Sequence, residues 1–150
     1  MTGRMELAGF KAMTRGLVIG LAVVVALVSY DITIPTGESA GRNWKFVLTH
    51  PTILLHVIAA TIVVIGAIAL VIRSARNHNS PWIVLSVLGL AFALLAFAAG
   101  ENYVRTLHNS NLSAMSIGWA GGIVTFGIGW YWSHRAERQA QKHLSSATGN

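Results

Sequence analysis

Residues 51–72, PTILLHVIAATIVVIGAIALVI, decide the fold of this 150-residue chain. An α-helix needs about 20 apolar residues to cross the hydrocarbon core of a bilayer, and this stretch is long enough. It contains no Asp, Glu, Lys or Arg. Pro51 suits the first turn of a helix, where a missing backbone N–H costs nothing. The stretch therefore predicts a membrane-spanning helix with one ionisable residue, His56, near its first end.

The composition of the whole chain agrees with that prediction. Hydrophobic residues make up 53% and charged residues only 11%. Soluble domains carry about 25% charged residues, so this chain has too few to cover a water-facing surface. We therefore expect a polytopic membrane protein in contact with the lipid bilayer. In a soluble protein, the net charge of +6 would suggest that nucleic acid is a binding partner. Here the basic residues flank apolar stretches, as membrane topology requires, and no nucleic-acid partner is expected.

The absence of cysteine limits the chemistry. It excludes disulfides, cysteine-ligated iron–sulfur clusters, thiolate ligation of haem and covalent c-type haem attachment. A metal centre would have to use His, Met, carboxylate or amide ligands. Six histidines are available.

Three further apolar stretches repeat the pattern. The predicted spans, in a transmembrane domain of residues 1–132, are about 12–32, 51–72, 82–100 and 110–132. Residues 133–150 are expected to form a basic, flexible cytoplasmic tail, and the first span is expected to be retained rather than cleaved as a signal peptide. Small residues recur at spacings of three and four, as at Gly118 and Gly122, which favours close helix packing. The expected fold is all-α, an antiparallel four-helix transmembrane bundle.

Lys and Arg are distributed unevenly between the two sides of these spans. Three lie in the N-terminal 15 residues, two follow the second span at 73–76 and three lie in the tail, which makes eight of the eleven. Cytoplasmic segments are enriched in Lys and Arg, so both termini are predicted to be cytoplasmic, in a bacterial inner membrane. The loops at 31–50 and 101–111 would then face outward. Trp44 and Phe46 are expected to hold the second half of the longer loop on the bilayer surface.

The polar side chains that could carry chemistry gather at the predicted outer end. His56 heads a stripe of small residues, which directs it toward the bundle interior, and His108 opens the fourth span at the same membrane face. Two inward histidines suit axial ligation of a haem iron by neutral imidazoles. Arg105 could pair with a haem propionate, and His50 is a further candidate for cofactor contact. We therefore predict one bound haem b, with His56 and His108 as its iron ligands.

The same residues admit plainer interpretations. If Asn109 or Ser110 is the N-cap of the fourth helix, His108 lies outside that helix. Glu101 and Arg105 are four residues apart, so they can form a surface salt bridge that only lengthens the third helix. His50 can be an ordinary loop residue.

Two other classes of function are left open. One is an outer-face metal site, such as zinc, built from Glu101 and three histidines, His50, His56 and His108. The other is a cofactor-free membrane scaffold or accessory subunit that docks a larger complex through the face of Gly118 and Gly122. A proton or ion path is not expected, because the middle and inner parts of all four spans carry no charge and no histidine.

The arrangement of LLHVIAA around His56 and TLHNSN around His108 resembles one half of a haem A synthase. It is also similar to the wider group of four-helix b-type membrane cytochromes. The resemblance implies haem b ligated by these two histidines near the outer face. The sequence departs from the synthase pattern, since it has a single bundle, no cysteine pair and no carboxylate shortly before His56. The resemblance therefore implies electron transfer to a membrane redox partner, or haem handling, rather than a stand-alone enzyme that makes haem A.

Overall fold

The computed structural model contains five helices in the part of the chain that it describes. That part is residues 2–28, 34, 39–78 and 80–148, with side chains described for residues 8–27, 34, 39–78, 80–139 and 141–142. The helices are α1 (Thr2–Val28), α2 (Ala40–Thr49), α3 (Pro51–Arg76), α4 (Ser80–Thr106) and α5 (Asn109–Thr148). Four of them, all but α2, are long and apolar enough to cross a membrane. The predicted all-α transmembrane bundle is confirmed.

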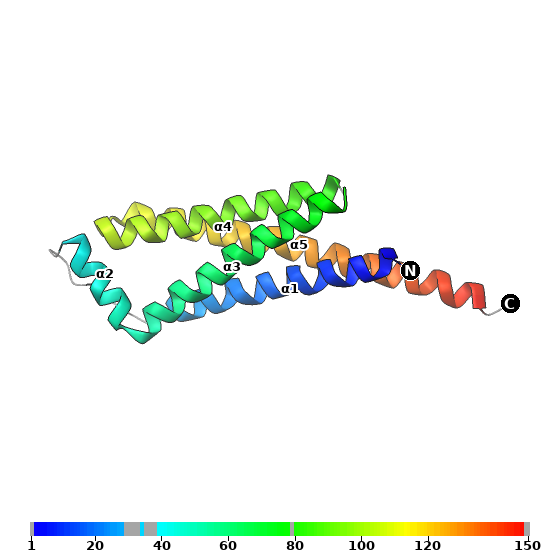
Figure 1. Cartoon of the computed structure of the whole chain (residues 1–150), viewed down its shortest axis with the longest axis horizontal. Helices are drawn as coiled ribbons and strands as arrows, with labels where there is room; N and C mark the ends of the chain where they lie inside the picture. The colour runs from blue at the N-terminus through cyan, green and yellow to red at the C-terminus, as the bar shows by residue number, and fades with distance from the viewer. Residues whose placement is uncertain (1, 29–33, 35–38, 79, 149–150) are drawn as a thin grey trace.

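The four long helices form a ring (Figure 1). Going around it, α1 contacts α3, α3 contacts α4, α4 contacts α5, and α5 contacts α1. Among the described residues, the diagonal pairs α1/α4 and α3/α5 have no close backbone contact. We call the end that carries α2 the α2 end, and the end where α3 turns into α4 the hairpin end. α1 begins at the hairpin end, and α5 extends beyond the bundle there.

Several helix boundaries differ from the sequence prediction. α1 begins at Thr2 rather than near residue 12, and residues 29–32 of the predicted first span lie outside the described residues. The tail predicted to be flexible from residue 133 continues α5 without a break to Thr148. Ala, Glu, Arg, Gln and Lys dominate its first part, and these residues favour a helix wherever no Gly or Pro interrupts them.

The short helix α2 lies across one end of the bundle and contacts α3 and α4. Its Val47 is completely buried and belongs to a small apolar cluster with Ile34 and Val104. Asn43 is also buried, and its Nδ2 donates a hydrogen bond to the Val104 carbonyl 2.9 Å away. Its Oδ1 is buried without a partner in the described part of the chain. The second half of the 31–50 loop is therefore a helix that is anchored to the bundle through one apolar face and one amide.

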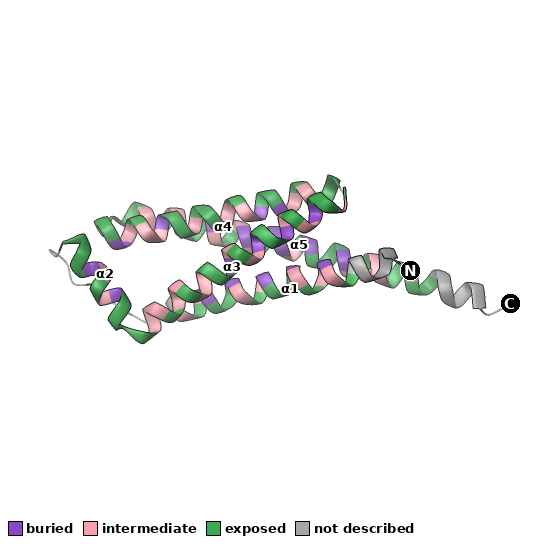
Figure 2. Ribbon diagram, in the orientation of Figure 1, coloured by how far each residue is buried: buried purple, intermediate pink, exposed green. Residues whose placement is uncertain are grey.

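Burial follows the seams between the long helices, while their outer faces remain open (Figure 2). The main core cluster combines residues of all four long helices, among them Leu21, Leu70, Ala93 and Phe126. Large apolar side chains such as Ile62 on α3 are exposed instead. An outward apolar surface is what a bundle surrounded by hydrocarbon requires, since no water is present there to solvate polar groups.

The backbones of α4 and α5 approach closely at Gly118. A Cβ added at this residue would lie 2.6 Å from the backbone nitrogen of Ala96 and 2.7 Å from the carbonyl oxygen of Phe92. Gly118 and Gly122 are both buried against neighbouring helices. The face that the sequence offered for docking a larger complex is therefore used inside the bundle, because only glycine allows the two backbones to approach this closely.

Aromatic and charged side chains join the helices at the hairpin end. Phe10 of α1 stacks on Trp82 of α4, with ring centroids 4.9 Å apart, and so bridges the diagonal of the ring. The Arg73 guanidinium of α3 lies over the Phe10 ring, 5.4 Å from its centroid. Lys11 of α1 forms a salt bridge with Glu137 of α5. These contacts fix the start of α1 against its neighbours.

The Gly118 contact can be tested with a matched pair of alanine variants. Gly118→Ala is expected to lower the free energy of unfolding by about 1–3 kcal/mol, because the added methyl meets backbone atoms that cannot move aside. Gly127→Ala on the same helix meets nothing within 4 Å and should leave stability unchanged or slightly raised. Reversible unfolding in mixed micelles measures both. Equal stability of the two variants would contradict the contact.

Candidate functional site

His56 of α3 is half-buried at the α2 end of the bundle and faces α1. Its ring Nδ1 lies 2.9 Å from the backbone carbonyl oxygen of Val24. A carbonyl can only accept a hydrogen bond, so Nδ1 carries the proton in this arrangement. A neutral imidazole protonated at Nδ1 keeps the lone pair on Nε2, which is the form that ligates metals. His56 therefore combines a helix-to-helix hydrogen bond with an Nε2 lone pair for which the described part of the chain offers no hydrogen-bond partner.

A second side chain makes the same kind of bond to α1 from the opposite neighbour. Trp119 of α5 donates its indole Nε1–H to the Leu21 carbonyl oxygen, at 2.9 Å. Sequence reasoning did not single out Trp119. The available signal was an indole N–H in the middle of an apolar span. Such a donor needs an acceptor, and because hydrocarbon offers none, the acceptor has to lie inside the bundle. The last turns of α1 are thus held by hydrogen bonds from both sides.

His108 lies in the turn between α4 and α5, outside both helices, and its side chain is exposed. The preceding residue, Leu107, has a φ of 54° and donates its N–H to the Tyr103 carbonyl oxygen at 2.7 Å. This left-handed residue ends α4. The His108 carbonyl then accepts the N–H of Asn111, so His108 caps the first turn of α5. His108 thus lies outside the helix, as the alternative expected, but the N-cap is His108 itself rather than Asn109 or Ser110.

The remaining predicted site residues are also found at the α2 end. His50, between α2 and α3, is exposed, stacks on the Phe46 ring at 3.6 Å and has its Nδ1 2.8 Å from the Phe46 carbonyl oxygen. Arg105 pairs with Glu101 along the exposed surface of α4. This is the surface salt bridge that the spacing allowed, and such exposed pairs contribute about 0–1 kcal/mol.

The structure places these residues at one end of the bundle without bringing the two histidines into contact. His56 stands on α3 and His108 precedes α5, and these two helices are diagonal in the ring. Within the described residues no group of three or more His, Asp or Glu side chains could hold a metal ion. The non-haem metal site with Glu101 and three histidines therefore gains no support from the described side chains.

Trp119 offers a direct measure of how much the bonds to α1 contribute. Trp119→Phe is expected to lower the free energy of unfolding by about 0.6–1.7 kcal/mol, the mean and the maximum found for hydrogen bonds between the helices of a membrane protein. Trp130→Phe, at an exposed position of the same helix, is the matched control and should cost less. The same unfolding assay in mixed micelles compares them. A larger loss in Trp130→Phe would show that the bond to Leu21 does not hold α1.

Comparisons with protein-family models, with curated proteins and with solved structures gave no match. Function is therefore argued from the residues of this chain.

Proposed function

We propose that this integral membrane protein binds one haem b at the α2 end of the bundle, for electron transfer or haem handling. His56 and His108 would be the axial ligands, and Arg105 would face the propionates. The observation that carries the proposal is the bond from His56 Nδ1 to the Val24 carbonyl oxygen. A carbonyl or carboxylate bonded to one ring nitrogen is the usual way in which proteins orient a metal-ligating histidine and fix its tautomer.

The residues meet the requirements of haem b to different degrees. His56 fits in tautomer, in burial and in its apolar surroundings. His108 lies at the same end, in a turn, and its exposed side chain would have to turn inward to reach an iron. Arg105 is exposed and pairs with Glu101, and its guanidinium would have to exchange that carboxylate for a propionate. When bound, haem would supply a one-electron carrier, and this chain would supply the ligands and an apolar pocket wall.

A cofactor-free membrane accessory protein is the second candidate. The specific observation in its favour is that His56 and Trp119 make equivalent bonds to α1. In that case His56 serves helix packing alone, as Trp119 does. Docking of a larger complex would then have to use a surface other than Gly118 and Gly122, since these residues pack inside the bundle.

An optical spectrum separates the two candidates. If haem b is bound, protein purified from cells supplied with haem shows a Soret band, and His56→Ala and His108→Ala each abolish it. His78→Ala, at an exposed residue of the hairpin end, is the control and should keep the band. A colourless wild-type protein would retire the haem proposal. His56→Ala should lower stability under both candidates, so stability alone does not decide.

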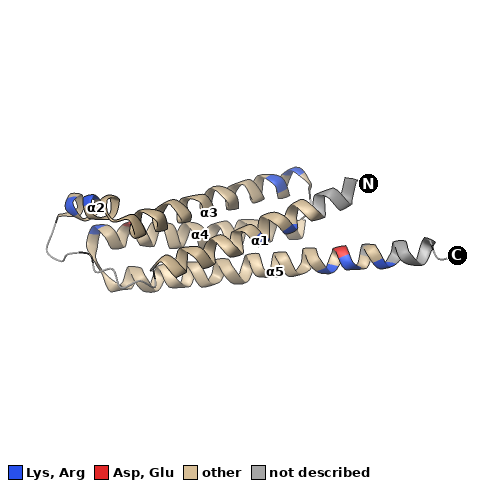
Figure 3. Ribbon diagram, turned by 90° about the horizontal axis from the view of Figure 1, so that it is seen from below, with Lys and Arg blue, Asp and Glu red and all other residues tan. Residues whose placement is uncertain are grey.

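We also propose that the hairpin end faces the cytoplasm of a bacterial inner membrane. The basic residues support this orientation, as Figure 3 shows for the described part of the chain. The α2 end carries Arg42, Lys45 and Arg105. The described residues at the hairpin end and along the extension of α5 include Lys11, Arg15, Arg73, Arg76, Arg135, Arg138 and Lys142. Excess Lys and Arg marks the cytoplasmic side.

The chain lacks cysteine, so single cysteines can report this orientation without background. Ser39→Cys before α2 and Ser80→Cys at the start of α4 are both exposed positions, at opposite ends of the bundle. In intact cells, a membrane-impermeant maleimide should label Ser39→Cys and spare Ser80→Cys until the membrane is opened. The reverse pattern of labelling would invert the proposed topology.

A further inference from the structure

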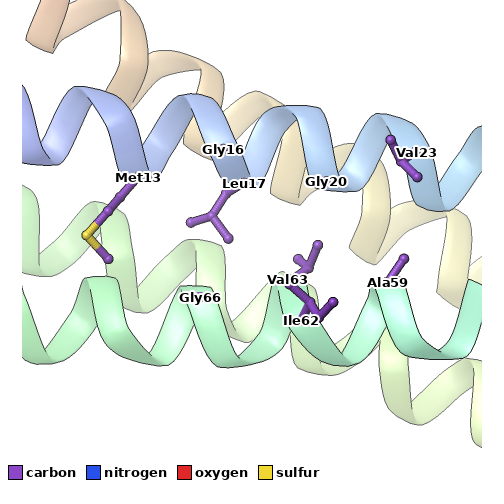
Figure 4. A pocket seen from close by; sticks show the side chains of 9 residues that line it. All are labelled: Met13, Gly16, Leu17, Gly20, Val23, Ala59, Ile62, Val63 and Gly66. Atoms are coloured by element: carbon purple, nitrogen blue, oxygen red, sulfur yellow. The ribbon is translucent and has the colours of Figure 1, made fainter.

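An apolar groove runs along the outer face of the seam between α1 and α3 (Figure 4). Its volume is about 420 Å³. Side chains that line it, such as Val23 and Ile62, are exposed, so the groove opens to the surroundings of the bundle. The lining is Met13, Gly16, Leu17, Gly20, Val23, Ala59, Ile62, Val63 and Gly66.

Missing side chains create this groove. A Cβ added at Gly16 would meet nothing within 4 Å, whereas one added at Gly20 would lie 2.9 Å from Val63. Gly20 thus lets the two helices approach, while Gly16 leaves open space beside them. From Met13 to Val23 is ten residues of helix, or about 15 Å. That length is about half the thickness of the hydrocarbon core, the depth of one leaflet.

A cationic side chain lies at the hairpin end of the same seam. Arg73 follows Gly66 by two helical turns on α3, and its guanidinium packs against Gly9, where an added Cβ would clash with it. Gly9 precedes Met13 by one turn on α1, so the guanidinium lies about 6 Å beyond the end of the groove. The Nε of Arg73 is buried and has no hydrogen-bond partner in the described part of the chain. Two exposed arginines, Arg15 and Arg76, stand on the same helices.

We propose that this seam binds a phospholipid with an anionic headgroup. One acyl chain occupies the groove, and the headgroup phosphate meets Arg73, with Arg15 and Arg76 adding positive potential around it. The apolar groove matches the acyl chain of such a lipid, and the cationic residues at the end of the groove match its headgroup. Basic pockets between membrane helices are known to bind anionic headgroups.

The acyl-chain half of the proposal is tested by filling the groove. Wild-type protein, purified in mild detergent and supplied with phosphatidylglycerol, should retain the lipid in native mass spectrometry. Gly16→Leu places a side chain in the open space and should reduce the retained lipid at least fivefold. Gly127→Leu is the matched control, because Gly127 of α5 also has nothing within 4 Å and lies outside the groove. This variant should retain the lipid as the wild type does.

The headgroup half is tested with an equimolar mixture of phosphatidylglycerol and phosphatidylcholine. Each basic residue near an anionic membrane surface favours binding by roughly fivefold, so Arg73→Gln should reduce the preference for phosphatidylglycerol by about that factor. Lys45→Gln, at an exposed position of the other end of the bundle, should keep it. If Arg73→Gln does not fold, Arg15→Gln and Arg76→Gln, both at exposed positions, replace it, and each is expected to reduce the preference by about the same factor.

Three results would overturn the proposal. Equal lipid retention by wild type and Gly16→Leu would show that no acyl chain uses the groove. Equal retention of the two lipids by wild type would show that the arginines select no headgroup. Loss of a dimer in Gly16→Leu, with lipid retention unchanged, would assign the groove to a second copy of the chain.

Discussion

The backbone contact between α4 and α5 at Gly118 is the constraint on which the rest of the bundle depends. Helices in lipid gain little from burying apolar surface against one another, because the surrounding hydrocarbon is as apolar as they are. Close backbone approach supplies the attraction instead, and here it brings Gly118 against the main chain of Ala96 and Phe92. The resulting pair has the most extensive contact in the structure. Within this pair, α5 contacts α1 and α4 contacts α3, and the contact between α1 and α3 closes the ring.

Polar side chains of its neighbours help to hold α1 in that ring, in addition to its apolar packing in the core. At the α2 end, His56 and Trp119 donate to carbonyls of its last turns. At the hairpin end, Arg73 covers Phe10, and Lys11 pairs with Glu137. Such bonds are effective inside a bundle because no water competes for the donors and acceptors. His56, which the sequence marked as a candidate ligand, therefore also serves assembly.

The two ends of the bundle differ in what they offer to other molecules. The α2 end has His50, His56 and His108, a buried amide and a short helix lying across α3 and α4. The hairpin end has guanidinium groups and an apolar groove that leads away from them. The haem proposal concerns the first end and the phospholipid proposal the second. They rest on different residues, so either can fail without affecting the other.

The sequence by itself determined the fold class and the elements that cross the membrane. Residues 51–72 are too long and too apolar for anything but a spanning helix, and hydrophobic length is a local property that needs no partner. The packing face of α5 was predictable too, because Gly118 and Gly122 are four residues apart and small residues at helical spacing mark close packing. The spacing of Glu101 and Arg105 likewise allowed their salt bridge.

Only the tertiary structure decided what faces each stripe. It assigned the Gly118 face to α4, turned His56 toward the Val24 carbonyl, left His108 in an exposed turn and opened a groove beside Gly16. The carbonyls of α1 that accept from His56 and Trp119 belong to backbone that every sequence shares, so no residue pattern identifies them. Which helices are neighbours and which are diagonal depends on all four packing faces at once, and spacing along one helix does not contain that information.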